Sequence, residues 1–196
     1  MRVFIAIELA GDVRAALAQE QERLRAVCAH NREIRWTRPE GWHLTLKFLG
    51  EISDQRARQV IGALQALAGF EKFAVEVKGF GFFPDPRRPR VFWAGIEGPP
   101  ALAELAGRVE TVMQELGFPR ELRPFRPHLT LARFQKPRPS PELEAAFRNG
   151  NSPSFGRSEV SEFFLFESRL RPGGAEYRKV AEFAIPQPQS GIGPEP

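Results

Sequence analysis

The sequence predicts an α+β fold of two pseudo-symmetric lobes, each a mainly antiparallel β-sheet covered by helices, with a central cleft between them. The first observation is that His-Leu-Thr-Leu occurs twice, at residues 43–46 and 128–131. The second is that residues 3–6 (Val-Phe-Ile-Ala) resemble residues 91–94 (Val-Phe-Trp-Ala). The third is that each of these segments is followed by a helical pattern, a proline-containing loop and the tetrapeptide, in that order. The repeats indicate a duplicated unit.

We predict one bilobal domain over residues 1–186, with repeats at approximately 2–88 and 90–185. Two copies of such a unit usually pack about a pseudo-two-fold axis, so equivalent residues meet at the centre. Residues 187–196 are rich in Pro, Gly and Gln. That composition predicts a disordered tail.

Hydrophobic periodicity and turn residues predict the order of the elements. Strands are expected at residues 3–8, 42–49, 73–78, 91–96, 128–134, 160–167 and 177–185. Helices are expected at residues 13–29, 54–68, 100–116 and 141–148. Their predicted end signals are Asp12 and Ser53 or Asp54 as N-caps, Pro99 and Pro100 at a first turn, and Gly117 after a last turn. Residues 35–41, 80–89 and 120–127 are expected to be loops.

Composition excludes several classes of protein. The chain is 42% hydrophobic and 27% charged, which is typical of a soluble globular protein. Its single cysteine, Cys28, excludes an internal disulfide and a cysteine-based zinc site. The N-terminal apolar run is too short for a signal sequence, and nothing approaches the ~20 apolar residues of a membrane span. We expect a cytoplasmic monomer with no membrane contact.

The distribution of charge is more informative than its sum. The chain has 28 basic and 24 acidic residues, a net charge of +4. Two basic clusters stand out in loops: Arg87, Arg88 and Arg90 in the first, and Arg120, Arg123, Arg126, Arg133, Lys136 and Arg138 in the second. Basic side chains near a cleft favour an anionic substrate such as a phosphate.

The repeated tetrapeptide has a polar and an apolar face if it lies on a strand. Alternation places His43 and Thr45 on one face, roughly 6.5–7 Å apart along the strand, and the two leucines on the other. His128 and Thr130 are arranged in the same way. If the lobes face each other, the polar faces supply two imidazoles and two hydroxyls to one cleft.

These four groups suit phosphodiester cleavage without a metal. Histidine titrates near pH 6.5, so at neutral pH one imidazole can accept a proton while a protonated one donates. The threonine hydroxyls can donate hydrogen bonds to phosphate oxygens. The third histidine, His30, lies outside the pattern and is expected to contact carbonyls at a helix end. We expect no metal and no cofactor, and no Ser or Cys has a recognisable nucleophile setting.

Three segments carry a resemblance to a known family. They are residues 2–7 (Arg-Val-Phe-Ile-Ala-Ile), residues 42–50 (Trp-His-Leu-Thr-Leu-Lys-Phe-Leu-Gly) and residues 125–133 (Phe-Arg-Pro-His-Leu-Thr-Leu-Ala-Arg). Residues 168–170 and 175–177 add to it. The chain resembles the 2H phosphoesterase superfamily over residues 2–186. The closer match is its LigT/ThpR branch, the RNA 2′,3′-cyclic phosphodiesterases, also called 2′-5′ RNA ligases.

The resemblance implies hydrolysis of an RNA 2′,3′-cyclic phosphodiester to a 2′-phosphomonoester, and it allows reversible ligation of tRNA halves through a 2′-5′ linkage at the same site. It implies His43 as the proton donor and His128 as the proton acceptor. It implies Thr45, Thr130 and Arg133 as phosphate contacts. Simple alternation puts Arg133 on the leucine face, so a bulge or the end of the strand is needed to turn it toward the phosphate.

Two other functions remain open from the sequence. One keeps the chemistry and changes the substrate to a 2′-5′ oligonucleotide or a small cyclic nucleotide. The other is a non-catalytic module that binds RNA ends. The paired histidines argue against the second, because binding alone does not require two titratable groups.

Overall fold

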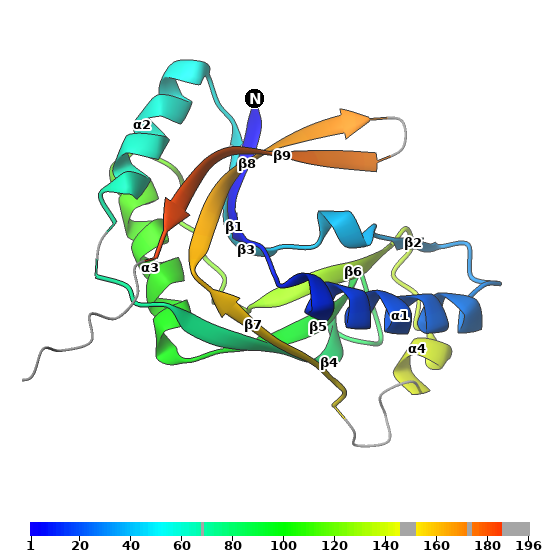
Figure 1. Ribbon diagram of the computed structural model, residues 1–196. Helices are drawn as coiled ribbons and strands as arrows, with labels where there is room; N and C mark the ends of the chain where they lie inside the picture. The colour runs from blue at the N-terminus through cyan, green and yellow to red at the C-terminus, as the bar shows by residue number, and fades with distance from the viewer. Residues whose placement is uncertain (68, 146–151, 172–173, 186–196) are drawn as a thin grey trace, which may run out of the picture.

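The computed structural model describes residues 1–67, 69–145, 152–171 and 174–185 (Figure 1). The predicted tail at 187–196 lies outside these ranges. The fold is mixed α and β with two antiparallel sheets, as predicted. Sheet A has the order β3 (Leu44–Glu51), β1 (Arg2–Ile7), β8 (Glu162–Arg171) and β9 (Gly174–Ala184). Sheet B has the order β2 (Ile34–Trp36), β6 (His128–Phe134), β5 (Val91–Glu97), β4 (Phe73–Phe83) and β7 (Ser154–Val160).

Neither sheet is built from one half of the chain. In sheet A the motif strand β3 pairs with β1, and β1 pairs with β8 from the second half. In sheet B the motif strand β6 pairs with β5, and β5 pairs with β4 from the first half. The two sheets therefore share one arrangement, in which a motif strand pairs with the strand that opens its repeat and that strand pairs with one from the other half of the chain. The duplicated unit with limits near 2–88 and 90–185 stays a prediction, but the lobes are interwoven rather than sequential.

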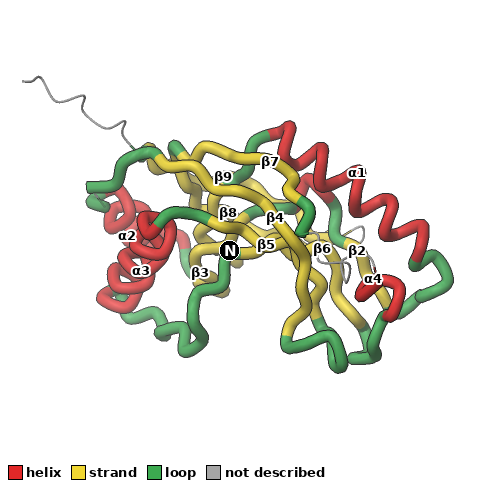
Figure 2. The backbone as a smooth tube through the Cα atoms, turned by 90° about the horizontal axis from the view of Figure 1, so that it is seen from below, coloured by secondary structure: helices red, strands yellow, loops and turns green. Residues whose placement is uncertain are grey.

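The helices cross between the sheets in the same reciprocal way. Helix α1 (Gly11–Val27) follows β1 of sheet A and packs against β7 of sheet B. Helix α3 (Pro100–Glu115) follows β5 of sheet B and packs against β3 of sheet A. α3 also contacts α2 (Asp54–Gln65). The pair α2 and α3 lies at one end of the molecule and α1 with α4 (Pro141–Ala145) at the other (Figures 1 and 2). None of the helices described is long and apolar enough to cross a membrane.

Helix ends follow the local signals in most cases. The Ser53 hydroxyl accepts from the backbone N–H of Arg56 and caps α2. Gly117 has a φ of 82° directly after α3, a backbone conformation that favours glycine. The prediction of Asp12 as an N-cap is wrong. α1 begins at Gly11, and Asp12 accepts from the N–H of Val13 inside the first turn.

Two strands, β2 and β7, were not predicted, and several others differ from their predicted limits. The predicted loop at 35–41 contains the end of β2 and a short 3-10 helix, η1 (Pro39–Gly41). β4 extends to Phe83, into the predicted loop at 80–89, because Gly81 leaves space for the ring of Trp93 in the adjacent strand. β7 precedes the predicted strand at 160–167, which is β8. β2 and β7 are both edge strands: β2 has only 3 residues, and β7 is mostly polar, so neither gives a sustained alternating pattern. Helix α4 ends at Ala145, and residues 146–148 of its predicted range lie outside the described residues.

Candidate active site

The two motifs lie on strands that approach each other where the sheets meet. β3 and β6 have Cα atoms within 8 Å of one another. His43 stands directly before β3, and His128 is the first residue of β6. The four motif leucines are buried, as the alternation predicts: Leu44, Leu46, Leu129 and Leu131. Both histidines and both threonines are only partly buried.

Each motif strand carries a β-bulge at the same place. In β1–β3 the pairing passes from Ala6↔Thr45 to Ile5↔Lys47 and skips Leu46. In β5–β6 it passes from Trp93↔Thr130 to Phe92↔Ala132 and skips Leu131. The last leucine of each tetrapeptide therefore has no pairing partner on the neighbouring strand. A bulge of this kind puts two successive side chains on one side and reverses the alternation beyond it.

The bulges turn the residue three positions after each threonine back to the polar face. Leu131 and Ala132 are both buried, and Arg133 is exposed. The bulge that Arg133 requires is therefore present in β6. Phe48 holds the equivalent position in β3 and is 64% exposed. Sequence reasoning did not single out Phe48, because without the bulge it belongs to the core face.

Aromatic rings surround His43. Its imidazole stacks on Phe4 with ring centroids 4.4 Å apart and an interplanar angle of 28°. Phe166 lies 6.1 Å away in a stacked orientation, and Tyr177 meets the imidazole edge-on at 5.0 Å. These rings come from β1, β8 and β9, so sheet A as a whole builds the setting of His43.

His128 has a smaller aromatic setting. Phe83 meets its imidazole edge-on at 4.9 Å, and Trp93 lies 6.3 Å away. A Cβ atom at Gly81 would lie 2.2 Å from the Trp93 ring. Glycine at this position therefore allows Trp93 to lie against β4 beside His128.

A backbone carbonyl two residues upstream anchors the imidazole of His128. Nδ1 of His128 lies 2.6 Å from the carbonyl oxygen of Arg126. Since a carbonyl only accepts, Nδ1 carries the hydrogen, and Nε2 of the neutral ring keeps its lone pair. The Gly41 carbonyl, two residues before His43, favours the charged form of that ring. The anchored His128 ring keeps Nε2 for proton exchange.

Burial makes both imidazoles harder to protonate. It lowers the pKa of His43 to about 4, although the Gly41 carbonyl and the Glu8 carboxylate favour the charged form. It also lowers the pKa of His128, opposed by the Arg126 carbonyl and assisted by the positive charge of Arg133. The sequence led us to expect one protonated imidazole at neutral pH. In the unliganded protein both are mainly neutral there.

The two basic clusters are neighbours in space. The N–H of Phe134, the last residue of β6, donates to the carbonyl of Arg90 at 3.0 Å. This bond joins the loop of the first cluster to the strand that leads into Lys136 and Arg138. All the basic side chains of both clusters are exposed. The bond places Arg90 of the first cluster beside the end of β6 that carries Arg133.

His30 is separate from this site and pairs with Glu142, with Nε2 and Oε1 3.4 Å apart. It therefore contacts a carboxylate rather than the helix carbonyls expected from the sequence. Within the described ranges, no three His, Cys, Asp or Glu side chains cluster as metal ligands would.

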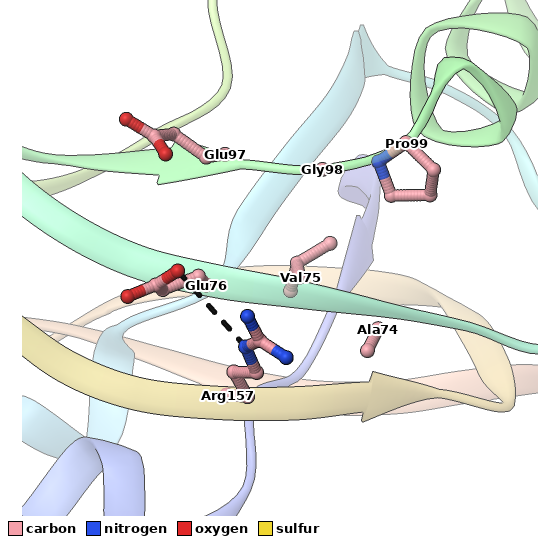
Figure 3. Close-up of a pocket in the computed structure, with 7 residues that line it drawn as sticks. All are labelled: Ala74, Val75, Glu76, Glu97, Gly98, Pro99 and Arg157. Atoms are coloured by element: carbon pink, nitrogen blue, oxygen red, sulfur yellow. Dashed lines mark ion pairs between the residues drawn. The ribbon is translucent and has the colours of Figure 1, made fainter.

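A surface pocket of about 270 Å³ lies elsewhere, between β4, β7 and the start of α3 (Figure 3). Glu76 on its wall accepts from Ser154 Oγ at 2.6 Å and pairs with Arg157 at 4.0 Å. Its lining holds two carboxylates, Glu76 and Glu97, against one guanidinium, Arg157, which disfavours a phosphate, and no motif residue lines it. We therefore do not place the active site there.

Comparison with known proteins identifies the family of this chain. The family model described as "LigT like Phosphoesterase" matches residues 7–93 and 96–177. The chain belongs to this LigT-like phosphoesterase family. A relative from Methanothermobacter thermautotrophicus named RNA 2′,3′-cyclic phosphodiesterase is 31% identical, covering 94% of this chain and 99% of the relative. A relative from Aeropyrum pernix with the same name is 37% identical, covering 82% of this chain and 92% of the relative.

Solved LigT-like structures share the whole fold. A Thermus thermophilus protein superposes with a TM-score of 0.78 at 31% identity, covering 95% of this chain and 99% of the other. Escherichia coli LigT, solved in complex with 3′-AMP, superposes with a TM-score of 0.78 at 26% identity, covering 95% of this chain and 98% of LigT. The two-lobed LigT-like fold therefore extends over nearly the whole sequence.

Proposed function

We propose that this LigT-like phosphoesterase hydrolyses RNA 2′,3′-cyclic phosphodiesters to 2′-phosphomonoesters, with His43 and His128 as acid and base. The observation that carries the proposal is the matched pair of half-sites. Each offers one imidazole and one threonine hydroxyl, at the start of two strands that approach each other. The names of the relatives, RNA 2′,3′-cyclic phosphodiesterase, support the choice of substrate.

The proposed reaction needs only these side chains and water. Nε2 of neutral His128 takes a proton from the water whose oxygen attacks phosphorus. The bond between phosphorus and O3′ breaks, and protonated His43 delivers its proton to O3′. Thr45, Thr130 and Arg133 hold the non-bridging oxygens, where negative charge must be stabilised. Proton exchange with solvent then restores both imidazoles, and no metal takes part.

Binding of the substrate favours the protonated form of His43 that the reaction needs. In the unliganded protein its pKa of about 4 leaves it neutral at pH 7. An anionic phosphodiester within hydrogen-bond distance favours the charged imidazole and raises its pKa. Binding the phosphate therefore prepares the acid. The assignment of His43 rather than His128 as donor follows the family resemblance.

The test uses an oligonucleotide with a 2′,3′-cyclic phosphate end, incubated with the protein in EDTA. We expect a 2′-phosphate product, and we expect His43→Ala and His128→Ala each to reduce turnover by at least ~100-fold. His30→Ala is the matched control, because that histidine is exposed and away from the motifs. Retained cyclic ends, activity lost to EDTA, or a fully active motif variant would contradict the proposal.

Substrate identity is tested with a panel. It contains the cyclic-ended RNA, a 2′-5′-linked oligoadenylate and a small cyclic nucleotide, because the motifs specify only how phosphate is handled. Adding an RNA with a 5′-hydroxyl end scores ligation, in which that hydroxyl replaces water as the nucleophile at the same site. Faster turnover of either alternative would reassign the substrate. End-specific binding without turnover would favour a binding module. The cytoplasmic location and the monomeric state stay predictions.

A further inference from the structure

A hydrogen-bond network joins the residue before His43 to the backbone of the second motif. The indole N–H of Trp42 donates to the hydroxyl oxygen of Thr37 at 2.8 Å. The single hydrogen of that hydroxyl is shared between the carbonyl oxygens of Thr130 at 2.8 Å and Leu131 at 2.9 Å. The backbone N–H of Thr37 also donates to Leu131, at 2.9 Å. One threonine outside both motifs therefore contacts both half-sites.

Gln21 of α1 completes the network from the core. Its Nε2 donates to the carbonyls of Thr37 and Leu131, each at 3.0 Å. Gln21 is 6% exposed and Trp42 is 3% exposed, so water does not compete freely for these bonds. Leu131 is the bulged residue of β6, where pairing with β5 is interrupted. Thr37 and Gln21 hold its carbonyl from the other side, which stabilises the bulge that turns Arg133.

The position of His43 depends on the same network. His43 stands outside the β1–β3 ladder, whose last register pair is Ile7↔Leu44. Its two neighbours in the chain are both held: Leu44 pairs with Ile7 in the ladder, and Trp42 is held by its indole and by a backbone bond from its N–H to the Pro39 carbonyl at 3.2 Å. The Thr37 network therefore fixes one side of His43. A threonine hydroxyl has one hydrogen and two lone pairs, so it can accept from Trp42 while donating to the second motif. Valine has nearly the same shape and can do neither.

We propose that Thr37 is a positioning residue that fixes the spacing of the two half-sites by tying Trp42 to Thr130 and Leu131. The proposal rests on the proposed function, in which both half-sites act on one phosphate. Catalytic groups must be held close to their productive geometry, and a misplacement of about 1 Å can cost ~100-fold in rate. The threonine touches no substrate in this scheme and acts only through its neighbours.

The kinetic test compares Thr37→Val, Thr37→Ser and Thr111→Val on the cyclic-ended oligonucleotide. We expect Thr37→Val to lower kcat by ~10- to 100-fold with little change in KM, because the phosphate contacts remain while the spacing is lost. Thr37→Ser keeps the hydroxyl and restores most of the rate. Thr111 donates to the Gly107 carbonyl on the exposed face of α3, so Thr111→Val loses a similar bond and keeps wild-type kcat.

A second variant separates the bond from folding defects. Trp42→Phe keeps an aromatic ring in the core and removes the indole N–H together with part of the ring, so its melting temperature is measured beside its kcat. If the Trp42–Thr37 bond carries the effect, Trp42→Phe lowers kcat, and the double variant is little slower than Thr37→Val alone. A lowered melting temperature with wild-type kcat in both single variants would make Thr37 merely structural and would overturn the proposal.

Imidazole carbon–proton NMR signals give a readout that does not depend on turnover. The chain has three histidines, so His30 serves as an internal reference. We expect Thr37→Val to move the signals of His43 and His128 together and to leave that of His30. If these signals move but the wild-type protein does not cleave the RNA, positioning by Thr37 stands and the proposed function fails. If the wild-type protein cleaves it and neither kcat nor the signals change, only the positioning proposal is overturned.

Discussion

The imidazole of His43 lies on the ring of Phe4, with centroids 4.4 Å apart and planes inclined by 28°. Phe4 is 2% exposed, so this contact places one face of the imidazole against the apolar core of sheet A. Charge on the ring is costly there, and burial is the largest cause of the lowered pKa of His43. The strand that repeats in the sequence as Val-Phe-Ile-Ala thus sets the protonation of the first motif.

The buried His43 makes the folded protein sensitive to acid. Between pH 6.5 and about 4 the unfolded chain binds a proton on this side chain that the folded protein does not. Unfolding then takes up a proton, so stability falls as the pH drops through this window. The loss from this one group is about 2 to 3 kcal/mol at pH 4.

His43→Gln removes the side chain that takes up this proton. Its free energy of unfolding is therefore expected to fall less between pH 7 and pH 4.5 than that of the wild-type protein. Urea unfolding at each pH measures the difference. His30→Gln is the control, because His30 is exposed and paired with Glu142. Equal acid sensitivity in the wild-type protein and His43→Gln would contradict the lowered pKa.

The pH dependence of catalysis follows from the same two imidazoles. The proposed reaction needs one of them protonated and the other neutral, and kcat/KM reports the free enzyme. Both pKa values lie below 6.5 in the unliganded protein, so kcat/KM is expected to fall tenfold per pH unit on the alkaline side of an optimum below pH 6.5. The alkaline limb of kcat lies at higher pH, because bound phosphate raises the pKa of the donor. Assays from pH 4.5 to 8.5 at constant ionic strength test this. An optimum of kcat/KM above pH 7.5 is the opposing result.

The sequence was sufficient to predict the strands and helices that are marked by nearby residues. The motif strands could be predicted because each alternates apolar and polar residues, and α2 and α3 because Ser53, Pro100 and Gly117 mark their ends. The exchange of β4 and β8 between the sheets could not be predicted. It depends on pairing between segments far apart in the chain, and the repeats favour the simpler arrangement of one lobe per half.

The site shows the same division between local and non-local causes. A repeated His-x-Thr could be found in the sequence, whereas the bulges at Leu46 and Leu131 could not. Both leucines fit an ordinary alternating strand, and only their register against β1 and β5 makes them extra residues. The position of Phe48 depends on this register. The low pKa of His43 likewise depends on Phe166, which lies on a strand from the other half.

Arg133 links phosphate binding to the protonation of His128. It is exposed on the polar face, and within the described residues it forms no ion pair. We expect Arg133→Ala to raise KM by ~10-fold or more through the loss of a charge-assisted contact. Because its positive charge lowers the pKa of His128, its removal also moves the acid limb of kcat/KM to higher pH.

Arg133→Lys separates these two effects. It keeps the charge, so the acid limb stays near its wild-type position while KM recovers only in part. Arg138→Ala removes an exposed charge from the same basic cluster and is expected to change KM by less than Arg133→Ala does. A KM and an acid limb unchanged in Arg133→Ala would remove Arg133 from the phosphate site.

A buried ion pair holds the bulge of β3 against α3. Lys47, directly after the bulged Leu46, has a side chain that is 4% exposed. Its ammonium donates to both carboxylate oxygens of Glu110 at 2.8 Å and to the carbonyl of Pro119 at 2.9 Å. Glu110 also accepts from the N–H of Glu121 at 2.9 Å, so the pair ties the bulge to the loop that leads into His128.

Replacing Glu110 is expected to lower the free energy of unfolding more than replacing Lys47. Glu110→Ala leaves a buried ammonium without a counter-charge and is expected to lower the free energy of unfolding by about 3 to 5 kcal/mol. Lys47→Met fills the same space with an apolar chain, and Glu110, whose side chain is 21% exposed, can turn to water, so the loss is smaller. Glu104→Ala on the exposed face of α3 is the matched control, with a change within about 0.5 kcal/mol. Urea unfolding at pH 7 gives all three values, and equal losses for Glu110→Ala and Glu104→Ala would show that the pair does not stabilise the fold.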